Sequence, residues 1–300
     1  MAVRLKTVRT VRALRKEVAA WRSRRQPVAL VPTMGALHDG HLALVELAHA
    51  HAKRVVVSIF VNPAQFAPHE DFEAYPRDES GDRRKLAGAG VDLIYAPRTK
   101  EIYPPGFSTR VQVGGVSEGL EGASRPHFFG GVATVVSKLL IQAQPDVAIF
   151  GEKDYQQLKV IERLSRDLDL RPRIVGAPIV RETDGLAMSS RNAYLTPEQR
   201  VVAPLLFQTI TGVASDIADG RAVDEALAAG HARLDAAGFA VDYVEARGAA
   251  SLQPHQEAGG ERLRVLAAAL LGRTRLIDNV PVPRRRRRAA HDPFTAVRAR

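Results

Sequence analysis

Short runs of β-branched and apolar residues alternate along this chain with longer stretches of helical character, and this alternation restricts the fold most strongly. The runs lie at residues 27–32, 54–62, 91–96, 145–150 and 173–180. Between them, helices are expected over residues 40–53, 80–89, 131–143 and 154–169. Strands that alternate with helices of this length predict βαβ units. We therefore expect an α/β fold with a Rossmann-like, doubly wound parallel sheet, which binds its ligand at the carboxyl ends of the strands.

The pattern changes after residue 191. Helices are expected over residues 197–217, with Pro197 in the first turn, and over residues 223–237. The later runs at 241–245 and 263–266 alternate in hydrophobicity and could pair as strands. These elements predict a second, smaller α+β domain.

Three segments follow from these patterns. Residues 1–181 are expected to form the Rossmann-like catalytic domain, and residues 182–283 a small α+β lid domain. Five adjacent arginines open the segment 284–300, where mutual repulsion favours a disordered tail.

The net charge of +10 is concentrated at the two ends of the chain. Residues 1–26 hold nine basic residues and one acidic residue, and residues 284–300 hold seven and one. The remaining body carries 27 basic and 31 acidic residues, so it has no excess positive charge for a nucleic-acid groove. Nucleic acid or an anionic surface is expected to bind, if at all, through the arginine-rich tail.

The basic N-terminal stretch has two interpretations. It is rich in arginine and poor in acidic residues, as a mitochondrial transit peptide is. However, Leu14, Val18 and Trp21 continue an apolar stripe at helical spacing, which favours an amphipathic helix packed on the core.

Two classes of protein are disfavoured by composition. The longest apolar runs, such as residues 55–61, are far shorter than the roughly 20 residues of a membrane span. The chain has no cysteine, which excludes disulfides, thiol nucleophiles and cysteine-ligated zinc.

A histidine pair follows the first predicted strand of the sheet. His38 and His41 lie three residues apart at the start of a predicted helix, whose free N–H groups favour an anion. Two imidazoles there can donate hydrogen bonds to phosphate oxygens. A metal-binding pair is the alternative, but no carboxylate at the expected spacing completes it. The pattern therefore predicts phosphate binding.

A second polar cluster follows the predicted strand at 145–150. Lys153 provides a compact positive charge suited to a phosphate, and Asp154 can accept a hydrogen bond from a ribose hydroxyl or cap the next helix. The alternative is a solvated turn with no ligand.

These motifs resemble those of known enzymes. The HxGH element of His38 and His41 resembles the signature of the nucleotidyltransferase superfamily, which includes class I aminoacyl-tRNA synthetases. The surrounding sequence resembles the pantoate–β-alanine ligase family (the pantothenate synthetases) from about residue 27 to Asn279. The blocks that carry this resemblance are residues 31–41, 58–63, 65–66, 75–77, 150–158 and 188–192.

The resemblance implies a cytoplasmic, homodimeric ligase of pantothenate and coenzyme A biosynthesis. It implies ATP-dependent condensation of (R)-pantoate with β-alanine through a pantoyl-adenylate intermediate, with release of AMP and pyrophosphate. ATP is expected as a substrate and Mg²⁺ as the metal.

The resemblance also implies roles for particular residues. His41 is expected to act as proton donor, with His38, Lys153 and Arg191 as further catalytic groups. ATP is expected to contact Met34, Gly35, Ala36, Leu37, His38, Asp39, Gly40, His41, Gly151, Glu152, Lys153, Asp154, Val180, Met188, Ser189, Ser190 and Arg191.

Pantoate and β-alanine are expected at Gln65, Gln157 and Asn62. Glutamine amides suit hydroxyl groups because they add no negative charge. The apolar wall of the substrate pocket is expected to comprise Pro32, Met34, Phe60 and Val132.

The loop at residues 188–191 resembles the KMSKS-type loop of the superfamily, with Arg191 facing the triphosphate. Its place at the predicted domain junction leads us to expect that the small domain closes over ATP and excludes water. Solution scattering with and without ATP and pantoate tests this closure.

Two departures from the family pattern are visible. The motif Arg-Pro-x-His-Phe-x-Gly-Val is replaced by a segment in which His127 lies one place early, so its role is in doubt. Of the acidic residues after Arg77, only Asp82 aligns with a metal-associated position, and Mg²⁺ commonly rides on nucleotide phosphates.

Three alternatives remain on the sequence alone. The first is a nucleotidyl-transferring or tRNA-charging enzyme for another carboxylate, although no anticodon-binding domain is apparent. The second is a nucleic-acid-binding protein that acts through its basic ends, and the third is a catalytically silent relative.

Overall fold

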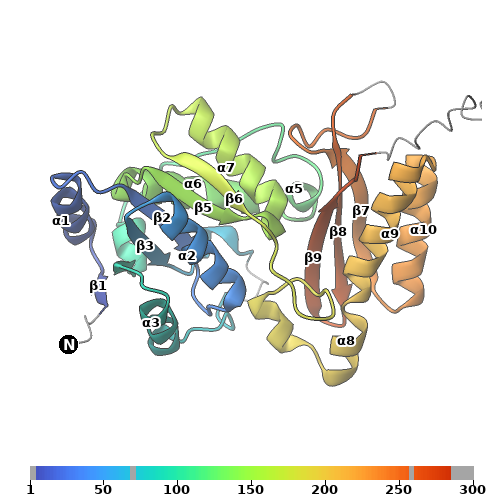
Figure 1. Ribbon diagram of the computed structural model, residues 1–300, viewed down its shortest axis with the longest axis horizontal. Coiled ribbons are helices and arrows are strands. Elements are labelled where there is room, and N and C mark those ends of the chain that lie inside the picture. The colour runs from blue at the N-terminus through green and yellow to red at the C-terminus, as the bar shows by residue number, and fades with distance from the viewer. Residues whose placement is uncertain (1–4, 68–71, 257–259, 285–300) are drawn as a thin grey trace, which may run out of the picture.

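The computed structural model describes residues 5–67, 72–256 and 260–284. Its larger sheet has six parallel strands in the order β1-β4-β3-β2-β5-β6 (Figure 1). The strands are β1 (Lys6–Val8), β2 (Val28–Thr33), β3 (Arg54–Ile59), β4 (Leu93–Tyr95), β5 (Val147–Gly151) and β6 (Arg173–Ala177).

Helices cover both faces of this sheet, which confirms the doubly wound α/β fold. Helices α1 (Val11–Arg22), α6 (Phe128–Ala143) and α7 (Tyr155–Asp167) pack on one face. Helices α2 (Asp39–His51) and α3 (Glu79–Gly88) pack on the other. Because β2, β3 and β5 are buried on both faces, their sequences are continuous apolar runs rather than alternating ones.

The N-terminal basic stretch contains a packed helix. Leu14 and Val18 of α1 are fully buried against α6, and the hydroxyl of Thr10 caps the helix by accepting from the backbone N–H of Ala13. The apolar stripe therefore belongs to the core. The three-residue edge strand β1, which pairs with β4, was not predicted because it is too short to show a period.

The C-terminal domain holds a separate antiparallel sheet in the order β7-β8-β9. Its elements are α8 (Pro197–Val202), α9 (Leu205–Asp219), α10 (Val223–Ala236), β7 (Ala240–Gly248), β8 (Leu263–Leu271) and β9 (Thr274–Pro281). The pairing predicted between residues 241–245 and 263–266 is confirmed, as Glu245 pairs with Leu266. Figure 1 shows α9 and α10 together beside this sheet.

The prediction of a single helix over residues 197–217 is wrong. A turn at Ala203 and Pro204 separates α8 from α9, because proline has no N–H for the helical hydrogen bond to Arg200. By length and composition alone, the described stretch Pro197–Asp219 could cross a membrane. Its apolar residues on α9, such as Leu206 and Ile210, are buried in the C-terminal core instead.

The strand order reverses beside β2, which pairs with β3 on one side and with β5 on the other. The crevice outside the carboxyl ends of such neighbouring strands is the usual ligand site of a doubly wound sheet. Two short 3₁₀ helices lie close to this edge, η1 (Pro63–Gln65) after β3 and η2 (Glu152–Asp154) after β5.

Candidate active site

A cleft of about 960 Å³ opens at this carboxyl edge and extends to β9 of the C-terminal domain. The apolar wall expected from the sequence borders it, namely Pro32, Met34, Phe60 and Val132. Most of the expected ligand contacts also line the cleft: His38, Gly40, His41, Asn62, Gln65, Gly151, Lys153, Asp154, Gln157, Val180, Met188, Ser189, Ser190 and Arg191. Residues more than 150 positions apart are therefore brought to one crevice.

The remaining expected contacts lie beside the cleft. Gly35, Ala36 and Leu37 form the backbone of the loop that ends in His38. Asp39 borders an adjoining pocket of about 280 Å³, which shares His38, Met188 and Ser189 with the cleft. Glu152 turns away from the cleft, and its carboxylate accepts a hydrogen bond from Arg264 at 3.0 Å.

Asp82 supports the loop of Gly35, Ala36 and Leu37. Its carboxylate is 2 % exposed and accepts hydrogen bonds from the backbone N–H groups of Ala36, at 2.9 Å, and Leu37, at 2.8 Å. Ala36 has a positive φ angle, which is disfavoured for a residue with a side chain, and its hydrogen bond to Asp82 helps to hold it. The carboxylate of Asp82 thus supports the loop, and the metal-binding role expected for it stays a prediction.

The two imidazoles lie against each other at the start of α2. Their ring centres are 4.1 Å apart, and the backbone N–H of His38 donates to His41 Nδ1 at 3.3 Å. Since Nδ1 of His41 accepts, its Nε2 carries the proton of the neutral ring.

The environment keeps both rings neutral. Burial, and then the proximity of His38, Lys153 and Lys85, lowers the pKa of His41 to about 3. Burial and then Lys153 also lower the pKa of His38. At neutral pH, His41 is therefore a hydrogen-bond donor through Nε2–H rather than an imidazolium acid.

Gln65 is held in place by Asn62. The Asn62 amide donates to Gln65 Oε1 at 3.1 Å and to the carbonyl of Gly131 at 3.2 Å. Its oxygen accepts from Tyr103 Oη at 2.7 Å and from the backbone of Ala64. All four hydrogen-bonding positions of Asn62 are thus engaged within the protein, which makes it a support for Gln65 rather than a substrate contact.

Gln156 and Gln157, which follow η2, have different surroundings. Gln157 borders the cleft, as expected, whereas Gln156 is buried. The amide of Gln156 donates to the carbonyls of Val116 and Gly119, and its oxygen accepts from the backbone of Glu121. Gln156 therefore anchors the loop that leads into α5 (Glu121–Ser124).

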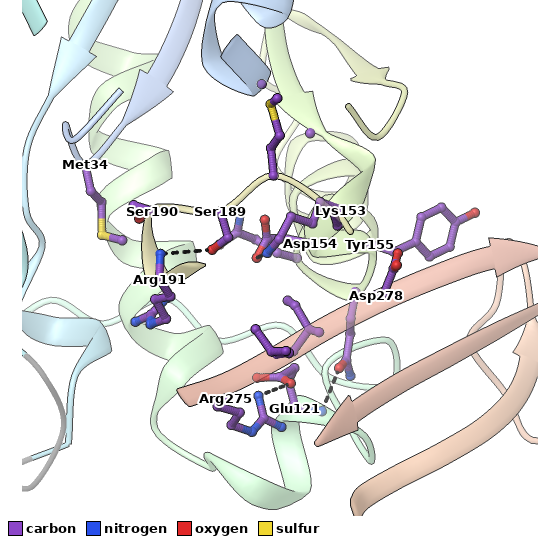
Figure 2. Close-up of a pocket in the computed structure, with 18 of the residues that line it drawn as sticks. Met34, Glu121, Lys153, Asp154, Tyr155, Ser189, Ser190, Arg191, Arg275 and Asp278 are labelled. Atoms are coloured by element: carbon purple, nitrogen blue, oxygen red, sulfur yellow. Dashed lines mark hydrogen bonds and ion pairs between the residues drawn. The ribbon is translucent and has the colours of Figure 1, made fainter. Parts of the chain in front are cut away.

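The loop at residues 188–191 faces Lys153 and Asp154 across the cleft (Figure 2). Ser189 caps the short helix η3 (Ser190–Tyr194) by accepting from the backbone N–H of Arg191 at 3.2 Å. Tyr75 Oη lies 3.4 Å from Ser190 Oγ. Hydroxyl groups and a guanidinium thus border the same cleft as the lysine, a set of groups suited to a polyphosphate.

The displaced histidine lies away from this site. His127 is exposed and does not border the cleft. The next residue, Phe128, lines the cleft, and the Arg125 guanidinium lies 4.0 Å from its ring centre.

The C-terminal domain contributes to the cleft, which was not predicted from the sequence. Asp278 and Asn279 of β9 border it and are both buried. An adjacent acid and amide inside an otherwise apolar run was the available signal, because buried polar groups need specific partners. Lys85, whose Nζ donates to the carbonyl of Leu37, was also missed.

Comparisons with known proteins agree on one family. A sequence model described as pantoate-beta-alanine ligase matches residues 6–281. The pantothenate synthetase of Caulobacter vibrioides is 58% identical over 281 residues, covering 92% of this chain and 98% of its own. The pantothenate synthetase of Rhodopseudomonas palustris (strain HaA2) is 58% identical over 275 residues, covering 91% of this chain and 97% of its own.

Solved structures give the same result. The pantothenate synthetase from Thermus thermophilus superposes with a TM-score of 0.87 at 48% identity, covering 93% of this chain and 99% of its own. The pantoate-beta-alanine ligase from Francisella tularensis, complexed with beta-gamma ATP and beta-alanine, has a TM-score of 0.76 at 32% identity, covering 92% and 97%.

Proposed function

This chain belongs to the pantoate–β-alanine ligase family and forms pantothenate, and we propose that it does so through a pantoyl adenylate. One observation carries the proposal. The neutral histidine pair, Lys153 and the loop of Ser189 to Arg191 border a single cleft where the strand order reverses. That set supplies donors and positive charge around a nucleotide, which suits direct attack of a bound carboxylate on ATP.

In the first proposed step, a pantoate carboxylate oxygen attacks the α-phosphorus of ATP. An acyl–phosphate bond forms, the bond to the bridging oxygen of the β-phosphate breaks, and pyrophosphate leaves. Lys153 and Arg191 offset the charge of the polyphosphate, and His41 Nε2–H donates to a phosphate oxygen. Gln65 and Gln157 orient pantoate against the apolar wall.

In the second step, the neutral amine of β-alanine attacks the acyl carbon of the adenylate. The amide bond forms as the acyl–oxygen bond breaks, AMP leaves, and the amine loses a proton to solvent. Enclosure of the cleft protects the adenylate from water during this step.

We propose that Mg²⁺ enters the cleft bound to the phosphates of ATP. Among the described residues, no group of three or more histidine or acidic side chains could hold a metal ion. Asp82 is engaged by backbone N–H groups, and among the described residues the metal would therefore be held by the nucleotide phosphates and by water.

Product analysis by mass spectrometry tests the proposal. With ATP, Mg²⁺, pantoate and β-alanine we expect pantothenate, AMP and pyrophosphate in equal amounts. Without β-alanine, pantoate should still support exchange of labelled pyrophosphate into ATP. Formation of ADP and phosphate in place of AMP and pyrophosphate would exclude the adenylate route.

Several expectations remain proposals. We propose a cytoplasmic homodimer with a domain boundary near residue 181. The arginine-rich tail, apart from Arg284, lies outside the described residues, so its predicted disorder and any binding to nucleic acid stay predictions.

A further inference from the structure

The strand β9 carries two adjacent polar side chains, Asp278 and Asn279, in its buried part. Asp278 is 3 % exposed and Asn279 is 2 % exposed, although aspartate and asparagine are both disfavoured in strands. The Asn279 amide nitrogen donates to the carbonyl of Glu152 at 2.9 Å and to the carbonyl of Lys153 at 3.0 Å. Since both partners are carbonyls, the amide nitrogen must face them.

These two carbonyls belong to the peptide groups on either side of the Lys153 α-carbon. Fixing both peptide groups fixes the direction in which the lysine side chain leaves the backbone. The Lys153 side chain borders the cleft, and Nζ lies 4.0 Å from Asp154 Oδ1, so this ion pair is loose. The backbone support from Asn279 is therefore the closer restraint on the lysine.

Asn279 is itself held rigidly. The two terminal nitrogens of the Arg181 guanidinium donate to the Asp278 carboxylate, at 2.6 and 2.9 Å. The same carboxylate accepts from the backbone N–H of Asn279 at 2.7 Å. A continuous set of hydrogen bonds thus runs from Arg181, which follows β6, through β9 to the turn that carries Lys153.

A neighbouring strand supports the same turn. Arg264 of β8 donates to Glu152 Oε2 at 3.0 Å, and its guanidinium lies 3.8 Å from the ring centre of Tyr155. Two strands of the C-terminal sheet, β8 and β9, therefore bind η2.

We propose that Asn279 is a positioning residue, through which the C-terminal domain places Lys153 for adenylate formation. The inference rests on the proposed function, because it assigns Lys153 to the first step. The position of the C-terminal sheet thereby determines where the Lys153 charge lies relative to the phosphates of ATP.

A double-mutant cycle tests the proposal, with pantoate-dependent pyrophosphate exchange as the readout. Asn279→Ala and the near-isosteric Asn279→Asp both lack the donor, and each should slow exchange about 10- to 100-fold. In a Lys153→Ala background, Asn279→Ala should have at most about a twofold further effect, because residues that act as a unit are non-additive. Transfer from supplied pantoyl adenylate to β-alanine should be slowed far less.

Val280→Ala is the matched control. Val280 is buried in the C-terminal core next to Asn279, so its truncation lowers the melting temperature without touching the lysine turn. It should leave exchange close to wild type. Multiplicative effects of Asn279→Ala and Lys153→Ala, or near-normal exchange by Asn279→Asp, would overturn the proposal.

A second readout separates this inference from the proposed function. The Lys153 charge lowers the pKa of His38, so Lys153→Ala should raise it, and Asn279→Ala should raise it too if the ammonium moves away. Histidine titration by NMR measures both. A raised His38 pKa only in the lysine variant contradicts positioning, whereas unchanged exchange in Lys153→Ala contradicts the role of the lysine in the proposed function.

Discussion

His41 has a protonation equilibrium that differs between the folded and unfolded chain. Its pKa is about 3 when folded, because the ring is buried and close to His38, Lys153 and Lys85, and 6.5 when exposed. Between these values the unfolded chain binds more protons, so stability falls as the pH falls below about 6.5. The folded enzyme therefore becomes less stable in acid because of the same environment that keeps His41 neutral.

Replacing His41 by asparagine should remove this contribution. From pH 6 to pH 5, the free energy of unfolding of the wild type should fall more than that of the variant, by up to about 1.4 kcal/mol per pH unit. Urea unfolding at pH 7, 6 and 5 measures the difference. Parallel curves for the two proteins would show that His41 titrates normally.

Asp82 allows a test between loop support and metal binding. Asp82→Asn keeps the shape, but its amide nitrogen would face a backbone N–H of Ala36 or Leu37. We expect kcat/KM for ATP to fall by roughly 10- to 100-fold, because the loop that carries His38 is displaced. The Mg²⁺ concentration for half-maximal activity should stay unchanged, and a large increase in it would favour a metal ligand instead.

The sequence could identify single residues only where local pattern sufficed. His38 and His41 were predicted together because both follow one strand and begin one helix. The roles of Asp82 and Asn62 were not predicted, because each depends on partners brought by other elements, such as the carbonyl of Gly131 for Asn62. A carboxylate that supports a loop and one that binds a metal have the same sequence signature.

At the scale of elements, α6 sets the position of η1. A side chain at Gly131 would place its Cβ 2.2 Å from the carbonyl oxygen of Ala64, so glycine is required for the helix to approach so closely. This carbonyl lies in the turn that carries Gln65. The packing of α6 thus determines where the proposed pantoate-binding amide lies.

Gly131→Ala should therefore displace η1 and raise KM for pantoate about tenfold or more, with a smaller change in KM for ATP. The adjacent Gly130→Ala is the control, because its nearest neighbour would be Gln112 at 4.0 Å. Gly130→Ala should be neutral or stabilising by up to about 1 kcal/mol, since alanine favours a helix. Steady-state kinetics and thermal unfolding of the pair check the prediction, and equal effects of the two would contradict it.

Elements were predictable where hydrophobic period alone determines them. The parallel strands β2 to β5 and the helices α2, α3, α6 and α7 were predicted within a few residues, because both faces of the sheet are buried and these strands are continuously apolar. Strand β9 was missed because Asp278 and Asn279 interrupt its apolar pattern, and their burial depends on Arg181 and the lysine turn. The break at Pro204 was overlooked although proline is a local signal.

At the scale of the whole molecule, polar contacts join the two domains beside the cleft. Arg275 of β9 donates to Glu121 Oε1 of α5 at 2.5 Å and also pairs with Asp242 of β7. Tyr243 Oη donates to the same Glu121 oxygen at 3.1 Å. Because Glu121 is buried, the Arg275 charge is needed to offset its desolvation. These contacts fix how the C-terminal domain covers the site.

Arg275→Ala should therefore weaken the contact between the two domains and let water reach the adenylate. We expect AMP formation to exceed pantothenate formation, whereas the two are equal in the wild type, because water competes with β-alanine for the intermediate. Arg273→Ala is the matched control, since Arg273 is an exposed arginine that borders the same cleft but has no ion pair among the described residues. It should keep the two products equal. Quantifying AMP and pantothenate in one reaction checks this, and equal products from Arg275→Ala would mean that other contacts suffice to exclude water.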